Sequence, residues 1–241
     1  MDNLEEQVEL IKAKLNLSKR IDRRLKVFGS SSHKYEVGNV VSEKNVIDFE
    51  EKYKIKLPKS YKIFLTQIGN GGNSFLNSAA GPFYGIYPLG ENVDELIDHP
   101  EIYLSKEVKI YPNMTNEFWE KLTSKIDSDE DMTDNEFETE MGNLYAGLLP
   151  IGSQGCTYLH ALILNGKNRG RVVNLDISRQ KPIFTHEENF LDWYERWLDE
   201  VISGELLKLG PKWFGYSIRK SSKIGLKELE RYPKKWYEIW K

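Results

Sequence analysis

LLPIGSQGCTYLHALILNGKNRGRVVNLDI, residues 148–177, is the stretch that most constrains the fold. Its runs of β-branched, aliphatic and aromatic residues are separated by short polar segments that contain glycine, a pattern typical of strands joined by turns. We expect three strands, which cover 148–152, 156–164 and 171–177. The last two are expected to pair antiparallel across the turn that starts at Asn165-Gly166 and extends to Gly170. The segment KPIF (181–184) predicts a further short strand.

Helical patterns precede this stretch. The stretch VIDFEEKYKIKLPKSYKIFLTQIGNGG (46–72) predicts two helices. Ser42, just before it, is placed to cap the first helix, and Pro58 suits the first turn of the second one, where its missing N–H costs nothing. The apolar face of the second helix holds Tyr61, Phe64, Leu65 and Ile68. We expect Gly69 to end this helix in the left-handed region, and Asn70-Gly71-Gly72 to form a turn with positive φ.

Further elements follow. FYGIYPLGE (83–91) alternates as a strand does, and Thr115 is placed to cap a helix that carries Trp119. Thr185-His186-Glu187-Glu188 has the pattern of a capping box, which predicts that a helix opens there. The buried side of that helix is expected to hold Phe190, Leu191, Tyr194, Trp197, Leu198 and Val201, with Trp193 at its edge.

The ends of the chain differ from its middle. Residues 3–28 have apolar residues at helical spacing, and 29–32 (GSSS) break that pattern, so we expect 1–30 to be an N-terminal helical extension. Residues 31–203 form the central domain. Residues 204–241 form a C-terminal extension that is basic and rich in tryptophan and tyrosine, which we expect to dock on the domain.

Composition excludes several classes of protein. The 241 residues include no apolar stretch long enough for a membrane span, and the N-terminus lacks the pattern of a signal peptide. The one cysteine, Cys156, excludes an internal disulfide and a cysteine-based metal cluster, which together with the missing signal peptide predicts a cytoplasmic protein. Residues 29–210 carry 29 acidic and 18 basic groups, which argues against direct nucleic-acid binding and is compatible with a basic partner; ordinary surface charge that keeps the protein in solution is the other interpretation.

The order of these features resembles the SUKH superfamily, in particular its Smi/Knr-type members. The resemblance covers about 42–203 and combines the Leu-Pro helix pair, the Asn-Gly-Gly turn and the later hairpin. The matching residues are Ile47, Phe49, Glu50, Leu57, Pro58, Tyr61, Phe64, Leu65, Asn70, Gly71, Gly72, Gly170, Val172, Phe190 and Trp197. Most of these residue types form turns and cores, and no catalytic residue is carried over. Nothing known of the family transfers to 1–30 or 204–241.

The resemblance implies an α+β fold, in which a mostly antiparallel central sheet is flanked by helices. It also implies a non-catalytic protein-binding module, such as a bacterial immunity protein that neutralises a cognate toxin, often a nuclease, by direct binding. The alternative is a regulatory scaffold linked to cell-wall synthesis, as in fungal relatives. An enzyme acting on a small substrate is a third hypothesis, and the sequence gives it little support. The oligomeric state stays open.

The segment IDSDEDMTDNEFETE (126–140) holds the candidate partner-binding site. We expect it to form an exposed loop that leads into a short helix. Its candidate contact residues are Asp127, Asp129, Glu130, Asp131 and Asp134. Such a carboxylate cluster could occupy the basic groove of a nuclease-type toxin domain, since that groove is built to attract phosphate. An ordinary solvated acidic loop is the other interpretation.

The same residue types could support other chemistry. Asp127, Asp129 and Asp131 match the start of a calcium-binding EF-hand loop, but Met132 stands where that loop needs glycine. Cys156 and His160 could suggest a nucleophile and its base, yet residues four apart in one strand lie about 13 Å from each other. No phosphate-binding loop occurs, and we expect no metal and no cofactor.

Overall fold

The computed structural model describes residues 3–72, 77–209, 214 and 216–232. The helices that precede the sheet are α1 (Asn3–Ile21), α2 (Ser30–His33), α3 (Glu43–Tyr53), α4 (Lys59–Ile63), the π-helical turn η1 (Phe64–Ile68), α5 (Pro100–Tyr103), α6 (Asn116–Ser128) and α7 (Asp134–Leu144). The strands are β1 (Leu148–Gly155), β2 (Tyr158–Ile163), β3 (Val172–Asp176) and β4 (Ile183–Phe184). The helices that follow are α8 (Phe190–Ile202), α9 (Glu205–Leu209) and α10 (Leu226–Leu229). The predicted α+β class is confirmed.

The four strands form one antiparallel sheet in the order β1-β2-β3-β4. The pairing of β2 with β3 was expected from the sequence. β1 runs three residues further than expected, because the chain reverses at Cys156, whose φ is 53°, and not at 153–155. Nearly all residues of β1, β2 and β3 are buried, so both faces of the sheet are covered.

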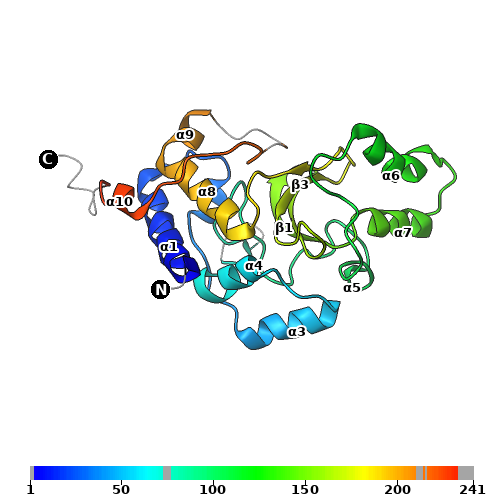
Figure 1. The fold of residues 1–241 in the computed structure, drawn as a ribbon, viewed down its shortest axis with the longest axis horizontal. Coiled ribbons are helices and arrows are strands. Elements are labelled where there is room, and N and C mark those ends of the chain that lie inside the picture. Colours follow the sequence, from blue (N-terminus) through cyan, green and yellow to red (C-terminus); the bar gives the residue numbers. More distant parts are fainter. Residues whose placement is uncertain (1–2, 73–76, 210–213, 215, 233–241) are drawn as a thin grey trace.

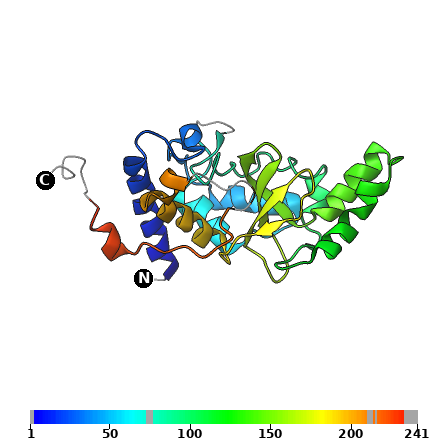
Figure 2. The ribbon, with the colours of Figure 1, turned by 90° about the horizontal axis from the view of Figure 1, so that it is seen from above.

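Helices gather at the two ends of the sheet (Figure 1). α1, α4 and α8 form one group, in which α1 and α4 both pack against α8. α5, α6 and α7 form the other group, and α6 packs against α7. The view from above shows that the pair α6 and α7 extends away from the sheet (Figure 2). This placement makes that pair the most prominent projection of the described part of the chain.

Helix α8 is the centre of the first group. Eleven of its thirteen residues are buried, including Trp193, because the sheet, α1 and the C-terminal segment together surround it. The predicted capping box at Thr185 is wrong. Asn189 caps α8 instead by accepting the backbone N–H of Asp192 at 3.0 Å, while the Thr185 hydroxyl donates to the carbonyl of Val172 at 2.8 Å.

Helix α1 ends at Ile21, seven residues earlier than the apolar pattern predicts. The Asp22 carboxylate accepts the backbone N–H of Lys26 at 2.7 Å and that of Val27 at 3.1 Å, which folds the chain into a turn. The same carboxylate accepts the hydroxyls of Ser30 and Tyr35 at 2.9 and 2.8 Å. These four hydrogen bonds are worth more to this buried side chain than another turn of helix.

The region from 69 to 91 also departs from the sequence pattern. Gly69 is extended, with φ 165°, because its N–H closes the π-helical turn on the carbonyl of Phe64. Gly71 and Gly72 do not take positive φ; Gly71 is needed because a Cβ there would lie 2.2 Å from Pro88 Cγ. Residues 83–91 are not a regular strand, although the N–H groups of Tyr84 and Tyr87 donate to carbonyls of β1.

Candidate binding surfaces

The pair α6 and α7 with its connecting loop, residues 116–144, forms a surface that we call the acidic hairpin. It carries ten aspartates and glutamates but only two lysines, which gives a net charge of −8 in a chain whose total is −3. Because the hairpin extends from the body of the molecule (Figure 2), a partner can approach this charge from several sides. The charge imbalance of the middle of the chain is therefore concentrated in one projection.

All five predicted contact residues lie on this hairpin and are exposed. The expected loop starts later than its sequence suggests, because Asp127 still lies in α6, whereas Asp134 is the first residue of α7, the helix into which the loop leads. α7 starts early because Thr133 and Glu136 form a reciprocal capping box. Asp129, Glu130 and Asp131 lie between the helices, as expected.

Two ion pairs fix the hairpin, and neither includes a carboxylate of the connecting loop. Asp127 binds the Arg179 guanidinium at 2.9 Å, and Lys125 bridges α6 to Glu140 of α7 at 2.6 Å. Within the described ranges, the three loop carboxylates and Asp134 have no ion pair. Phe137 adds an apolar contact point on α7, since 39% of its surface is exposed. These four carboxylates thus lie on the same hairpin as one aromatic ring, over which the Arg179 guanidinium lies at 5.9 Å.

The carboxylates of the hairpin are not arranged as the ligands of a cation would be. In the part of the chain that the structure describes, no three histidine, cysteine, aspartate or glutamate side chains gather as metal ligands would. Asp129 instead accepts the N–H of Asp131 at 3.2 Å, which shapes the loop locally.

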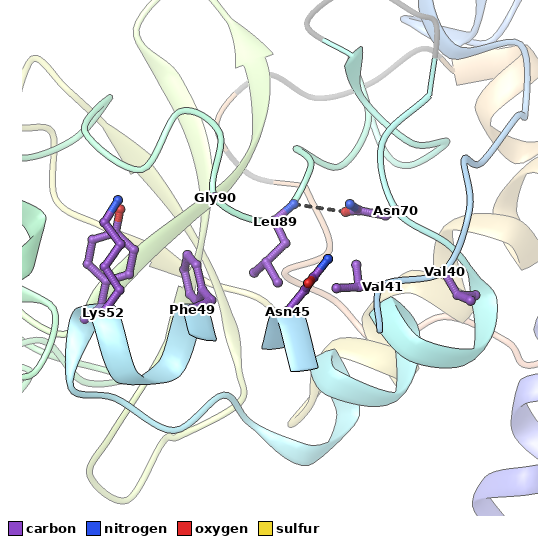
Figure 3. Close-up of a pocket in the computed structure, with 9 residues that line it drawn as sticks. Val40, Val41, Asn45, Phe49, Lys52, Asn70, Leu89 and Gly90 are labelled. Carbon is purple, nitrogen blue, oxygen red and sulfur yellow. Dashed lines mark hydrogen bonds between the residues drawn. The ribbon is translucent and has the colours of Figure 1, made fainter. Parts of the chain in front are cut away.

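A second surface lies between α3 and the loop at 88–101, and sequence patterns did not indicate it. We call it the α3 groove; two adjoining cavities of about 340 and 450 Å³ form it, and both are lined by Lys52, Tyr53 and Gly90. Figure 3 shows Asn45 and Phe49 rising from α3 toward Leu89 on the facing loop. The Asn70 side chain accepts the N–H of Leu89 at 2.9 Å, which fixes that loop.

Cys156 and His160 do not form a catalytic pair. Cys156 is exposed in the turn between β1 and β2, whereas His160 is completely buried beside the Trp193 ring, at 5.0 Å between ring centroids. Burial lowers the pKa of His160 to about 3, so its ring is neutral at physiological pH. A buried neutral imidazole has no access to a substrate, and it serves as a packing residue.

The described part of the C-terminal extension docks on the domain. The Tyr216 side chain is buried against Phe83 and His160, and its hydroxyl donates to Glu200 at 2.9 Å. Lys223 pairs with Asp192 of α8 at 2.8 Å. Trp213, Trp236, Tyr237 and Trp240, which make the extension rich in aromatic residues, lie outside the described residues.

Comparison with known proteins identifies the family. Residues 40–196, about two thirds of the chain, match the SMI1 / KNR4 family (SUKH-1). No curated protein and no solved structure matches the chain significantly. Among the described residues, no helix combines the length and the apolar content that a bilayer span requires. Members of this family generally act in immunity or cell-wall regulation and are generally non-catalytic. The chain belongs to the SMI1 / KNR4 family (SUKH-1).

Proposed function

We propose that this protein is a cytoplasmic immunity protein, which neutralises a cognate toxin by binding a basic domain of it. The acidic hairpin is the observation that carries this proposal. A nuclease-type toxin attracts phosphate with positive charge. Asp129, Glu130, Asp131 and Asp134, which have no ion pair with any residue that the structure describes, offer the complementary charge. The helix pair that carries them, α6 and α7, extends away from the sheet (Figures 1 and 2), which suits insertion into a concave basic surface.

The proposed mode of action needs no chemistry on the toxin. A bound hairpin excludes the nucleic-acid substrate by occupying its site, and a desolvated contact around Phe137 would slow dissociation. Long-range attraction by a net charge of −8 would speed the encounter, which matters because a toxin must be captured before it acts. A cell-wall scaffold, the alternative within this family, would not require a basic partner.

Reversing the charge of the hairpin tip is expected to weaken toxin binding about tenfold or more, because each close charge pair contributes roughly 1 kcal/mol or more to such a complex. The variant carries Asp129→Lys, Glu130→Lys and Asp131→Lys, which spare the Thr133–Glu136 capping box of α7 and the ion pairs. The measurement is calorimetric titration against the toxin domain encoded beside the gene, together with survival of cells that express the toxin.

A matched control separates this contact from net charge. The variant with Glu5→Lys, Glu6→Lys and Glu107→Lys changes the same number of exposed acidic residues outside the hairpin. It is expected to bind within about threefold of the unchanged protein and to protect cells. Equal binding by both variants would show that the hairpin is not the contact, and no binding of the neighbouring toxin by the unchanged protein would contradict the proposed function.

A further inference from the structure

The α3 groove has two chemically different ends. One end is lined by Val40, Val41, Phe49 and Leu89, and 52% of the Val40 surface is exposed although the residue is apolar. The other end is lined by Asp94, Asp98, Glu101 and Glu138. Tyr53 lies between them and lines both cavities. The groove therefore joins an apolar depression to an acidic one within a short distance along α3.

The apolar end is built to stay open. Asn70 holds the facing loop at Leu89, and Gly90 then turns with φ 90°, which a residue with a side chain rarely adopts. A Cβ on Gly90 would come to 3.9 Å from the Phe49 ring, at the wall of the groove. The walls come from α3 and from a loop that a hydrogen bond fixes, so the depression is preformed and a ligand would not have to order it.

The acidic end lacks enough cations to neutralise it. His99 lies 3.4 Å from Glu101, and Lys52 is held over the Tyr53 ring at 4.8 Å. Against these two side chains stand four carboxylates, of which Asp94, Asp98 and Glu101 are exposed. Phosphate groups would be repelled here, whereas arginine or lysine side chains would be attracted.

We propose that the α3 groove binds a segment of a partner protein in which one large apolar residue is followed closely by arginine or lysine residues. The apolar side chain fills the space between Val41, Phe49 and Leu89, and the cations bind the carboxylates of the acidic end. Two complementary features in a fixed order give the groove a direction, which neither the apolar end nor the acidic end has alone.

The groove and the acidic hairpin are continuous. Glu138 lines the acidic end of the groove, and it lies one helical turn after Asp134 on α7. A basic protein bound at the hairpin could therefore extend a segment along α3 without leaving negative surface. This assignment rests on the proposed function for the identity of the partner, but the recognition chemistry can be tested without the toxin.

The test uses a fluorescein-labelled peptide with one leucine followed by two arginines, spaced by glycines, and follows its anisotropy as the full-length protein is added at low salt. We expect binding that weakens about tenfold when the leucine is replaced by serine, and also when the arginines are replaced by glutamates. A peptide that binds equally well without its leucine would show charge attraction only, and would overturn the proposal. If no peptide binds, whatever the number of glycines between the leucine and the arginines, the proposal is overturned as well.

Protein variants locate the site. Asn45→Trp fills the apolar end and is expected to weaken peptide binding about tenfold, whereas Ile47→Trp on the exposed side of α3 is expected to change it less than twofold. Asp98→Lys is expected to weaken binding more than Glu107→Lys, which changes an exposed charge outside the groove. Lys52→Ala should strengthen binding, because it removes the cation between the two ends.

The outcomes separate this inference from the proposed function. Equal peptide binding by Asn45→Trp and Ile47→Trp would overturn the groove assignment and leave toxin binding by the hairpin untouched. If the peptide results hold while the neighbouring toxin does not bind, the groove stands and the immunity function fails. If Asn45→Trp weakens both the peptide and the toxin about tenfold, the toxin itself supplies the segment.

Discussion

Replacing Lys14 with methionine is expected to lower the free energy of unfolding by about 3–5 kcal/mol, because it leaves Asp199 buried without its counter-charge and leaves buried Glu195 with only the more distant Lys223 ammonium, at 3.9 Å. The Lys14 side chain is completely buried in the contact between α1 and α8. Its ammonium lies 2.7 Å from a Glu195 oxygen and 2.5 Å from an Asp199 oxygen. Both carboxylates are almost fully buried, so water cannot take the place of the ammonium.

Urea unfolding at pH 7.5 measures this effect. Lys12→Met is the matched control, because Lys12 lies on the same helix, has an exposed side chain and pairs with exposed Glu9. We expect this variant to change the free energy of unfolding by less than about 0.5 kcal/mol. The deficit of Lys14→Met should shrink at pH 5, because burial raises the pKa of Asp199 to about 6 and its carboxylate can then take up a proton. Equal unfolding midpoints for the two variants would show that α1 is not held to α8 by this charge cluster.

This prediction concerns a part of the chain outside the family match. Residues 40–196 match the family, whereas Lys14 comes from α1. A large effect of Lys14→Met would show that α1 contributes to the stability of the matched region through α8. A small effect would favour an N-terminal helix that can separate from it.

Acid is expected to destabilise the protein through two buried histidines. The pKa of His33 is lowered to about 4 and that of His160 to about 3, mainly because burial disfavours the charged ring. The His33 Nδ1 atom also accepts the N–H of Tyr35 at 3.0 Å, which requires a neutral ring. In the unfolded chain both histidines have a pKa near 6.5. Their contribution to the free energy of unfolding is therefore full above pH 6.5, and it is lost as the pH falls toward 4 for His33 and 3 for His160.

Asp199 acts in the opposite direction. Burial raises its pKa to about 6, so the folded state takes up this proton more readily than the unfolded state and regains stability between pH 6 and about 4. From pH 7 to pH 5, each histidine is expected to cost about 2 kcal/mol and Asp199 to return about 1 kcal/mol. Burial raises the pKa of Glu200 as well, which adds to the return.

Urea unfolding at pH 7 and at pH 5 is therefore expected to show that the unchanged protein loses about 2–3 kcal/mol of its free energy of unfolding in acid. The double variant with His33→Gln and His160→Gln has no such loss, and its stability should be constant or rise in acid because Asp199 and Glu200 remain. A wild-type protein that is at least as stable at pH 5 as at pH 7 would contradict this account.

Local patterns in the sequence predicted the sheet and many of the helices, because alternating or helical spacing of apolar residues reflects burial directly. The end of α1 was not predictable in this way. Asp22 ends that helix through the hydroxyls of Ser30 and Tyr35, which a pattern of apolar spacing does not include. Thr185 and Asn189 are both residue types that cap helices, and a contact with distant Val172 decides between them.

The two binding surfaces also differ in how far the sequence could predict them. The five predicted carboxylates are close in sequence, so their clustering on one projection could be anticipated. The α3 groove draws its lining from residues 40–41, from α3, from Asn70, from the segment 89–101 and from Glu138 of α7, and no run of sequence brings these together. Only the fold shows that apolar Val41 and acidic Asp98 line a continuous groove.

The central claim is that a negatively charged hairpin guides this protein onto a basic partner protein. The most direct test is the rate of association with the neighbouring toxin domain, measured by stopped-flow fluorescence between about 50 and 500 mM salt. We predict that the rate constant of the unchanged protein falls about tenfold or more over this range, and that the variant with lysines at 129, 130 and 131 starts lower and changes much less. Rates that do not depend on salt, or that are the same for both proteins, would contradict the account.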